Sequence, residues 1–178
     1  MKKLFVTTLI LFFFNFLSAQ DFYPLHIEKD QKNQKKWVDS MYNSMSINEK
    51  VGQLFMVDVF SKDSKNKTDL IDSLIKKYHI GGIIFSKGGP IRQAKLSNHY
   101  QNISKTPLLM AMDAEWGLAM RLDSTYAYPW NMTLGAITDN KIVYDIGKQI
   151  GEHVKRMGMH INFSPVVDIN TNPDNPII

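Results

Sequence analysis

The sequence has 178 residues, of which 44% are hydrophobic and 21% are charged. These proportions are typical of a protein with a packed core, and they exclude a disordered, collagen-like or coiled-coil chain. The net charge of +4 comes from basic residues that are scattered along the sequence rather than gathered in a stripe, so nothing predicts a nucleic-acid partner. The oligomeric state is not indicated.

Residues 1–20 have the pattern of a secretory signal peptide. Two lysines precede an apolar run over residues 4–17, and small and polar residues follow it. The run is shorter than the roughly 20 residues that a membrane-spanning helix needs. We therefore expect cleavage after Ala19 or Gln20, export to the periplasm or the outside of the cell, and no membrane attachment of the mature protein. The sequence has no cysteine, which excludes disulfides, thiolate metal sites and a cysteine nucleophile within it.

Two segments follow the signal. Residues 21–45 form a polar lead-in and then, over 34–45, an amphipathic helix with apolar residues at helical spacing. We take residues 46–178 as one domain, which opens with Ser46-Ile47-Asn48-Glu49. This tetrapeptide fits a capping box, in which a serine side chain and a glutamate side chain satisfy each other's backbone amides at the start of a helix.

Buried strands and amphipathic helices alternate in this domain. The apolar runs predict strands over residues 54–60, 80–85, 107–112 and 160–167. Helices are expected to begin at Thr68 or Asp69, at Pro90, and at Asp139 or Asn140. The helix that begins at Thr68 or Asp69 is expected to end before Gly81-Gly82, where left-handed backbone geometry is favourable. The helix that begins at Asp139 or Asn140 is expected to end at Gly158.

This alternation predicts a parallel α/β architecture. Three acids, Asp58, Asp113 and Asp168, lie at or near the carboxyl ends of predicted strands, the edge where such proteins gather binding and catalytic groups. A doubly wound dinucleotide-binding module is a poor alternative, because the Gly88-Gly89 loop lacks the G-x-G-x-x-G spacing.

The segment over residues 107–122 has the strongest chemical pattern. Asp113 follows a strand, Trp116 comes three residues later and Arg121 eight residues later. A carboxylate, an aromatic ring and a guanidinium at one pocket mouth suit a sugar, whose hydroxyls bind charged groups and whose apolar face lies on rings. The competing interpretation is structural: Asp113 caps the next turn, and Arg121 is a surface residue paired with it or with Asp123.

With these segments in place, the sequence resembles the N-terminal domain of glycoside hydrolase family 3, in its bacterial β-N-acetylglucosaminidase branch. Four segments in the family order carry the resemblance, namely residues 46–54, Gly81-Gly82-Ile83-Ile84-Phe85, the block from Asp113-Ala114-Glu115-Trp116-Gly117 to Arg121-Leu122, and residues 161–170 with Phe163-Ser164-Pro165-Val166-Val167-Asp168. The fold that this implies is a (β/α)₈ barrel of the TIM type, of which about the first half is present.

The resemblance implies roles for single residues. Asp113 and Arg121 match family contacts to ring hydroxyls of the bound sugar. Trp116 stands where this branch commonly has glycine, so it either shapes the sugar subsite or packs under the loop. Asp168 is interpreted as an acid that fixes a loop, with direct substrate binding as the weaker alternative, and Asp58 as structural.

The resemblance also implies a retaining mechanism, with a carboxylate nucleophile and a separate proton donor. In the family both come from later strands, and neither motif occurs here, so we expect substrate-binding residues but no catalytic residue, and no turnover by this chain alone. No cofactor or metal is implied. The histidines are left unassigned: His26, His79, His99, His153 and His160.

Three functions remain open from the sequence. The first is removal of terminal β-N-acetylglucosamine by a longer parent protein, because the Asp113 segment is closer to the hexosaminidase pattern. The second is a β-glucosidase of the same family. The third is a non-catalytic carbohydrate-binding protein. The expected partner in each case is a β-linked sugar or amino sugar.

Overall fold

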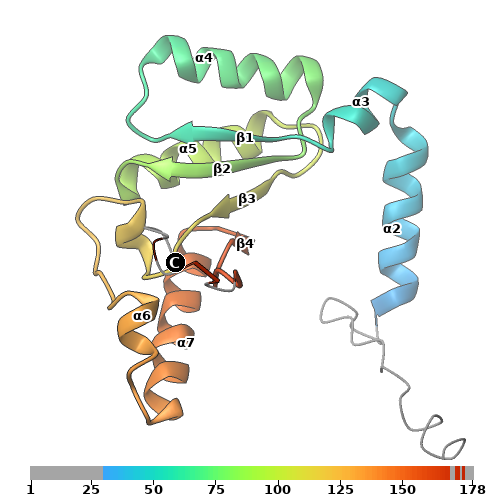
Figure 1. Cartoon of the computed structure of the whole chain (residues 1–178). Coiled ribbons are helices and arrows are strands. Elements are labelled where there is room, and N and C mark those ends of the chain that lie inside the picture. Colours follow the sequence, from blue (N-terminus) through green and yellow to red (C-terminus); the bar gives the residue numbers. More distant parts are fainter. Residues whose placement is uncertain (1–29, 169–170, 173, 175–178) are drawn as a thin grey trace, which may run out of the picture. The chain divides into compact units, whose positions relative to one another are not determined.

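The computed structural model describes residues 30–168, 171, 172 and 174 (Figure 1). The predicted signal peptide lies outside the described residues. The chain divides into two compact units, residues 1–44 and 45–178. In the first, the helix predicted over 34–45 is confirmed as α2 (Gln31–Ser44), whose apolar side chains Trp37, Val38 and Tyr42 stay largely exposed. No helix of the described residues is both long enough and apolar enough to cross a membrane.

The second unit alternates strands and helices, as the sequence predicts. Its elements are α3 (Ile47–Gly52), β1 (Met56–Phe60), α4 (Lys65–Ser73), η2 (Leu74–Tyr78), β2 (Gly82–Lys87), α5 (Pro90–Ile103), β3 (Leu109–Met112), η3 (Leu118–Met120), α6 (Asn131–Leu134), α7 (Asn140–Arg156) and β4 (Ile161–Asn162). The η2 segment is a single wide turn that continues α4, and η3 is a single tight turn.

The four strands form one parallel sheet in the order β1-β2-β3-β4. Crossovers between parallel strands are almost always right-handed, and such crossovers between consecutive neighbouring strands place the connecting helices on the same face. A doubly wound sheet would reverse its strand order and carry helices on both faces. The consecutive order is that of a (β/α)₈ barrel, which has eight such strands.

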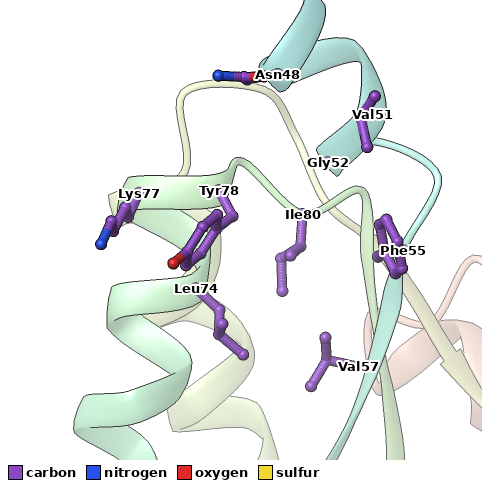
Figure 2. Close-up of a pocket in the computed structure, with 9 residues that line it drawn as sticks. All are labelled: Asn48, Val51, Gly52, Phe55, Val57, Leu74, Lys77, Tyr78 and Ile80. Carbon is purple, nitrogen blue, oxygen red and sulfur yellow. The ribbon is translucent and has the colours of Figure 1, made fainter.

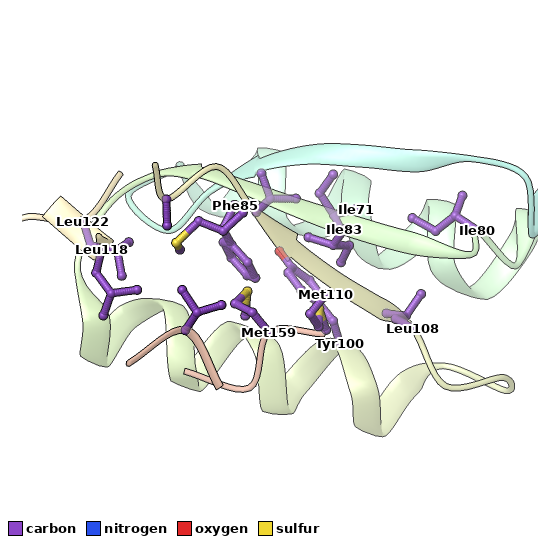
Figure 3. Packing of buried hydrophobic residues seen from close by; sticks show 14 of the residues in the cluster. Ile71, Ile80, Ile83, Phe85, Tyr100, Leu108, Met110, Leu118, Leu122 and Met159 are labelled. Atoms are coloured by element: carbon purple, nitrogen blue, oxygen red, sulfur yellow. The ribbon is translucent and has the colours of Figure 1, made fainter. Parts of the chain in front are cut away.

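One hydrophobic cluster fills the space between the sheet and its helices (Figure 3). Alternate strand residues point into it, because side chains along a strand alternate between faces. The strands contribute Val59, Ile83, Phe85, Met110 and Met112, and the helical segments contribute Ile71, Ile75, Tyr100, Ile150 and Val154. Each large side chain buried in this way stabilises the fold by about 1.5–3 kcal/mol.

The other face of the sheet carries Asp58. It lies in the middle of β1 rather than at its end, and its carboxylate accepts a hydrogen bond from the Ser86 hydroxyl. Asp58 is paired with Ile84, and Ser86, two residues further along β2, is the extra residue of a bulge, because Val59 is paired with Phe85 but Phe60 with Lys87. The contact agrees with the structural interpretation of Asp58.

The capping box before α3 is present as predicted. The Ser46 hydroxyl accepts a hydrogen bond from the Glu49 amide at 3.3 Å, and the Ser46 amide donates to Glu49 Oε2 at 2.7 Å. Glu49 Oε1 also accepts from Lys105 Nζ at 2.6 Å. The hydrogen bond from Lys105, followed by that from the Ser46 amide, lowers the pKa of Glu49 from 4.5 to about 2. Glu49 thus ties α3 to the loop before β3.

The first predicted helix differs from the structure at both ends. It begins at Lys65 after Ser64, so Thr68 and Asp69 lie inside it, because a polar first turn gives no periodic signal. At its end His79, not a glycine, takes the left-handed conformation with φ of 52°. Gly81 is needed for a different reason: a Cβ there would lie 2.1 Å from the Gln53 carbonyl oxygen.

The fourth predicted strand is much shorter than expected. The sequence predicts residues 160–167, but β4 comprises only Ile161–Asn162. The chain leaves the sheet because the Ser164 amide turns back to the Asn162 carbonyl at 2.9 Å, and Pro165 has no amide to donate to a neighbouring strand. The prediction that Asp168 ends this strand is therefore wrong.

Candidate functional site

Asp113 and Arg121 meet at the carboxyl end of β3. Asp113 directly follows the last strand residue, Met112, and an Arg121 Nη2 donates to Asp113 Oδ2. The two side chains are 29% and 24% exposed, so the pair is neither a surface bridge nor a closed internal one. The alternative partner of Arg121, Asp123, is instead paired with Arg92 at 2.7 Å.

A tight turn brings Arg121 back to the strand. Gly117 begins it with φ of 88°, a conformation that side chains other than glycine rarely adopt, and a Cβ there would lie 2.7 Å from the Tyr128 ring. The buried residues Leu118 and Leu122 then anchor both ends of the turn in the core. Packing therefore fixes the backbone on either side of Arg121.

The loop after β2 holds the other side of this turn. The Gly88 amide donates to the Arg121 carbonyl at 3.1 Å, and the Asp123 amide donates to the Gly88 carbonyl at 2.7 Å. Gly88 has φ of 143°, and a Cβ there would lie 1.7 Å from the Ser61 hydroxyl oxygen. The loops after β1, β2 and β3 are thus packed together where the strands end.

Asn162 fixes the backbone immediately after Asp113. Its Oδ1 accepts from the Ala114 amide at 2.9 Å, and its Nδ2 donates to the Ala114 carbonyl at 3.4 Å. Asn162 is not among the site residues predicted from the sequence. Its signal was available, because Asn162 immediately precedes the Phe163-Ser164-Pro165 motif on a predicted strand.

The Asp113–Arg121 pair has unused hydrogen-bonding capacity. Arg121 Nε is buried and finds no acceptor among the described residues. Asp113 Oδ1 likewise has no donor within the described part of the chain, where only Oδ2 is engaged. A ligand hydroxyl both donates and accepts, so it suits Asp113 Oδ1 and the exposed part of the Arg121 guanidinium, although the buried Nε is out of its reach.

Trp116 packs under the loop and also meets a second tryptophan. It is half-buried against the core cluster, and its ring centroid lies 5.9 Å from that of Trp130 at an interplanar angle of 44°. The contact with the core agrees with a packing role, and a part of Trp116 in the sugar subsite stays a prediction. Trp130, which the sequence analysis did not single out, is 67% exposed.

Asp168 is not part of this arrangement. It lies six residues beyond the end of β4 and is exposed. No hydrogen bond or ion pair of Asp168 is found within the described residues. Its predicted role in holding the loop stays a prediction. Asp168 does not lie at the end of β4, which was the reason for considering it as a site residue.

The described histidines have other partners. His99 pairs with Asp72 at 2.8 Å, His160 Nδ1 accepts from the Met110 amide at 3.0 Å, and the ring of His153 lies 6.1 Å from that of Tyr128. His26 lies outside the described residues. In residues 30–168, 171, 172 and 174, no three acidic, histidine or cysteine side chains gather as metal ligands.

A pocket of about 770 Å³ lies at the opposite end of the sheet, between α3, the amino ends of β1 and β2, and η2 (Figure 2). Its lining includes Val51, Phe55, Val57, Leu74 and Ile80, and it has no carboxylate. An apolar hollow without an acidic group does not suit a sugar. The charged pair at the other end of the strands is the better candidate.

Known proteins resemble this chain over most of its length. The sequence model of the glycosyl hydrolase family 3 N-terminal domain matches residues 46–178. A β-hexosaminidase A of Pseudoalteromonas piscicida is 31% identical over 121 residues, which is 61% of this chain and 20% of that protein. A β-N-acetylglucosaminidase/β-glucosidase of Cellulomonas fimi is 28% identical over 79% of this chain and 24% of that protein.

Among solved structures, a β-glucoside phosphorylase bound to 2FGlc superposes with a TM-score of 0.74 at 25% identity, covering 86% of this chain and 26% of that chain. This chain spans between a fifth and a third of the length of the curated relatives it matches. The barrel-type α/β fold that the sequence predicts is confirmed by the parallel sheet and this likeness. The chain belongs to glycosyl hydrolase family 3, through the N-terminal domain of that family.

Proposed function

We propose that this chain supplies the sugar-binding part of an active site that hydrolyses glycosidic bonds, and that the substrate is a terminal β-linked N-acetylglucosamine. The observation that carries the proposal is the partly exposed Asp113–Arg121 pair at the carboxyl end of β3, in which only one Asp113 oxygen is engaged within the described residues. The names of two relatives, a β-hexosaminidase and a β-N-acetylglucosaminidase/β-glucosidase, support this choice of sugar.

In this proposal Asp113 accepts hydrogen bonds from ring hydroxyls and Arg121 donates to a hydroxyl oxygen. The ion pair holds both side chains aligned before the sugar arrives, which lowers the entropy cost of binding. The nucleophile and proton donor of a retaining mechanism come from elsewhere in the protein. Residues 1–178 alone are then expected to lack turnover.

A β-glucosidase is the second candidate. The name of the Cellulomonas fimi relative includes that activity, and the superposed structure is that of a β-glucoside phosphorylase. Asp113 and Arg121 contact hydroxyls in either case, so they do not discriminate between the two sugars. A carbohydrate-binding protein without hydrolysis is the third, and it predicts binding without turnover.

The test uses the protein expressed from its complete reading frame. Chromogenic β-N-acetylglucosaminide and β-glucoside are each supplied, and release of the chromophore is followed. The proposal expects faster turnover of the N-acetylglucosaminide; preference for the glucoside would favour the second candidate, and binding without turnover the third. Turnover by residues 1–178 that is lost on Asp113→Ala would contradict the proposed absence of the catalytic pair.

We also propose that the protein is exported. The support is the lysine pair and apolar run of residues 1–20. N-terminal sequencing of the protein from its native cells checks this, and a mature chain that still begins at Met1 would overturn it.

A further inference from the structure

An exposed tryptophan stands beside the candidate sugar site without a role in the core. Trp130 is 67% exposed. Its backbone begins α6, since its carbonyl accepts from the Leu134 amide at 3.0 Å, but its side chain makes no capping bond. A large aromatic ring left in solvent loses the free energy that burial would give it. The local fold needs the Trp130 backbone, whereas its ring remains available to a ligand.

The ring is nevertheless held in place from one side. Trp116 lies 5.9 Å away and is itself packed against the core, so it supports Trp130 from beneath. The Tyr128 amide donates to the Trp116 carbonyl at 3.0 Å, which fastens the two loop segments together. A ring that is fixed on one side and open on the other is preorganised for stacking.

Position and polarity both connect this ring to the site. Trp116 is three residues beyond Asp113 and Trp130 immediately precedes α6, so both tryptophans lie on the segment that connects β3 to α6. The residues next to them in the sequence are also in contact, since Asn131 Nδ2 donates to Glu115 Oε2 at 3.2 Å. An aromatic plane with an exposed amide and a partly exposed carboxylate nearby matches a sugar, which has apolar ring faces and a rim of hydroxyls.

We propose that Trp130, supported by Trp116, is a stacking platform for a second ring of the substrate, the sugar on the leaving side of the cleaved bond. This inference rests on the proposed function and extends it to a second subsite. Glu115 and Asn131 would then meet the hydroxyls of that second sugar. The ligand class is a β-linked disaccharide or longer oligosaccharide rather than a simple glycoside.

The experiment compares substrates that differ only in the leaving group, using the complete protein. N,N′-diacetylchitobiose offers a second ring and methyl β-N-acetylglucosaminide does not; cellobiose and methyl β-glucoside form the same comparison for a glucosidase. Trp130→Ala is expected to raise KM for the disaccharide about 10-fold and to change KM for the methyl glycoside less than about 2-fold, because one aromatic stacking contact is lost. Trp130→Phe should recover most of the loss.

Tyr144→Ala is the matched control, because Tyr144 is 70% exposed but lies on α7. It should leave both KM values unchanged. Equal losses on both substrates with Trp130→Ala would show that the ring only supports the Asp113 loop, and no loss on either would show that it binds nothing. Either result overturns the proposal.

A second measurement separates this proposal from the proposed function. Disaccharide binding is followed by calorimetry, with the same variants, whether or not the protein hydrolyses it. If the wild-type protein binds the disaccharide without cleaving it and Trp130→Ala weakens binding about 10-fold, hydrolysis is refuted and the platform is supported. If the wild-type protein binds neither disaccharide, the platform is refuted as well.

Discussion

The two ends of the sheet each hold an acid paired with a base, but the pairs differ in how fully they are satisfied. At the amino end, Glu49 uses one oxygen for Lys105 and the other for the Ser46 amide. At the carboxyl end, Asp113 engages Arg121 through one oxygen within the described residues, and both side chains stay partly exposed. A saturated pair fastens segments together, whereas an unsaturated one has capacity left for a ligand. In barrels of this type, stability resides at the amino ends and binding at the carboxyl ends.

Asp113→Ala should produce the largest effect and is the most direct way to break this comparison. We expect kcat/KM of the complete protein for a chromogenic N-acetylglucosaminide to fall about 100-fold, since a hydrogen bond to a charged group contributes about 1.5–3 kcal/mol. Asp123→Ala, which removes the exposed Asp123–Arg92 pair, is the control and should have little effect. Equal losses from the two variants would argue against a binding role for Asp113.

Gly52→Ala tests whether the amino end is structural. A Cβ at Gly52 would lie 1.8 Å from the Tyr78 carbonyl oxygen, so α3 or the turn after η2 must move. We expect a loss of about 3 kcal/mol in the free energy of unfolding, measured with urea. In Gly151→Ala, where no atom lies within 4 Å, the change should stabilise α7 by about 0.5–1 kcal/mol. Wild-type stability in Gly52→Ala would contradict the close packing.

Glu49→Gln sharpens the comparison through pH. The pKa of Glu49 in the folded protein, about 2, is below its ordinary value of 4.5, so the carboxylate contributes stability above pH 4.5 and loses that contribution as the pH falls toward 2. The variant should be less stable than the wild type at pH 7, and the difference should shrink between pH 4.5 and 2. Urea unfolding curves at several pH values measure it, and a constant difference would refute the role of the charge.

The smallest effect is expected from Ser46→Ala. It removes only the hydroxyl that accepts from the Glu49 amide and leaves the bond from the Ser46 amide to Glu49 in place. A loss of about 1 kcal/mol in the free energy of unfolding is typical of such a cap. It should leave KM unaltered, because the residue lies at the end of the sheet away from Asp113. A change in KM would mean that the two ends are coupled.

Much of the fold could be predicted, because strands that are buried in the core appear in the sequence as apolar runs. Apolar runs predicted β1, β2 and β3, and Pro90 and Asp139 marked two helix starts correctly. The ends of strands and helices that depend on hydrogen bonds were harder to predict. The Phe163-Ser164-Pro165 run has the composition of a strand, yet the chain leaves the sheet after Asn162.

For the candidate site, spacing along the chain was a partial guide. Asp113 and Arg121 were predicted together, because a strand end and a short turn limit how far apart they can be. The contact of Trp116 with Trp130 could not be predicted, since it depends on how a long loop folds back. Asn162 could be placed on a strand, but its bonds to Ala114 depend on strand pairing and register.

The consecutive strand order also has a consequence for synthesis on the ribosome. Each strand after β1 pairs with the strand translated just before it. Within the described residues, no strand pairs with one that is distant in strand order. The sheet can therefore be extended one unit at a time as the polypeptide emerges, with each new helix covering fresh apolar surface. The strand order thus allows the sheet to assemble in the order of translation.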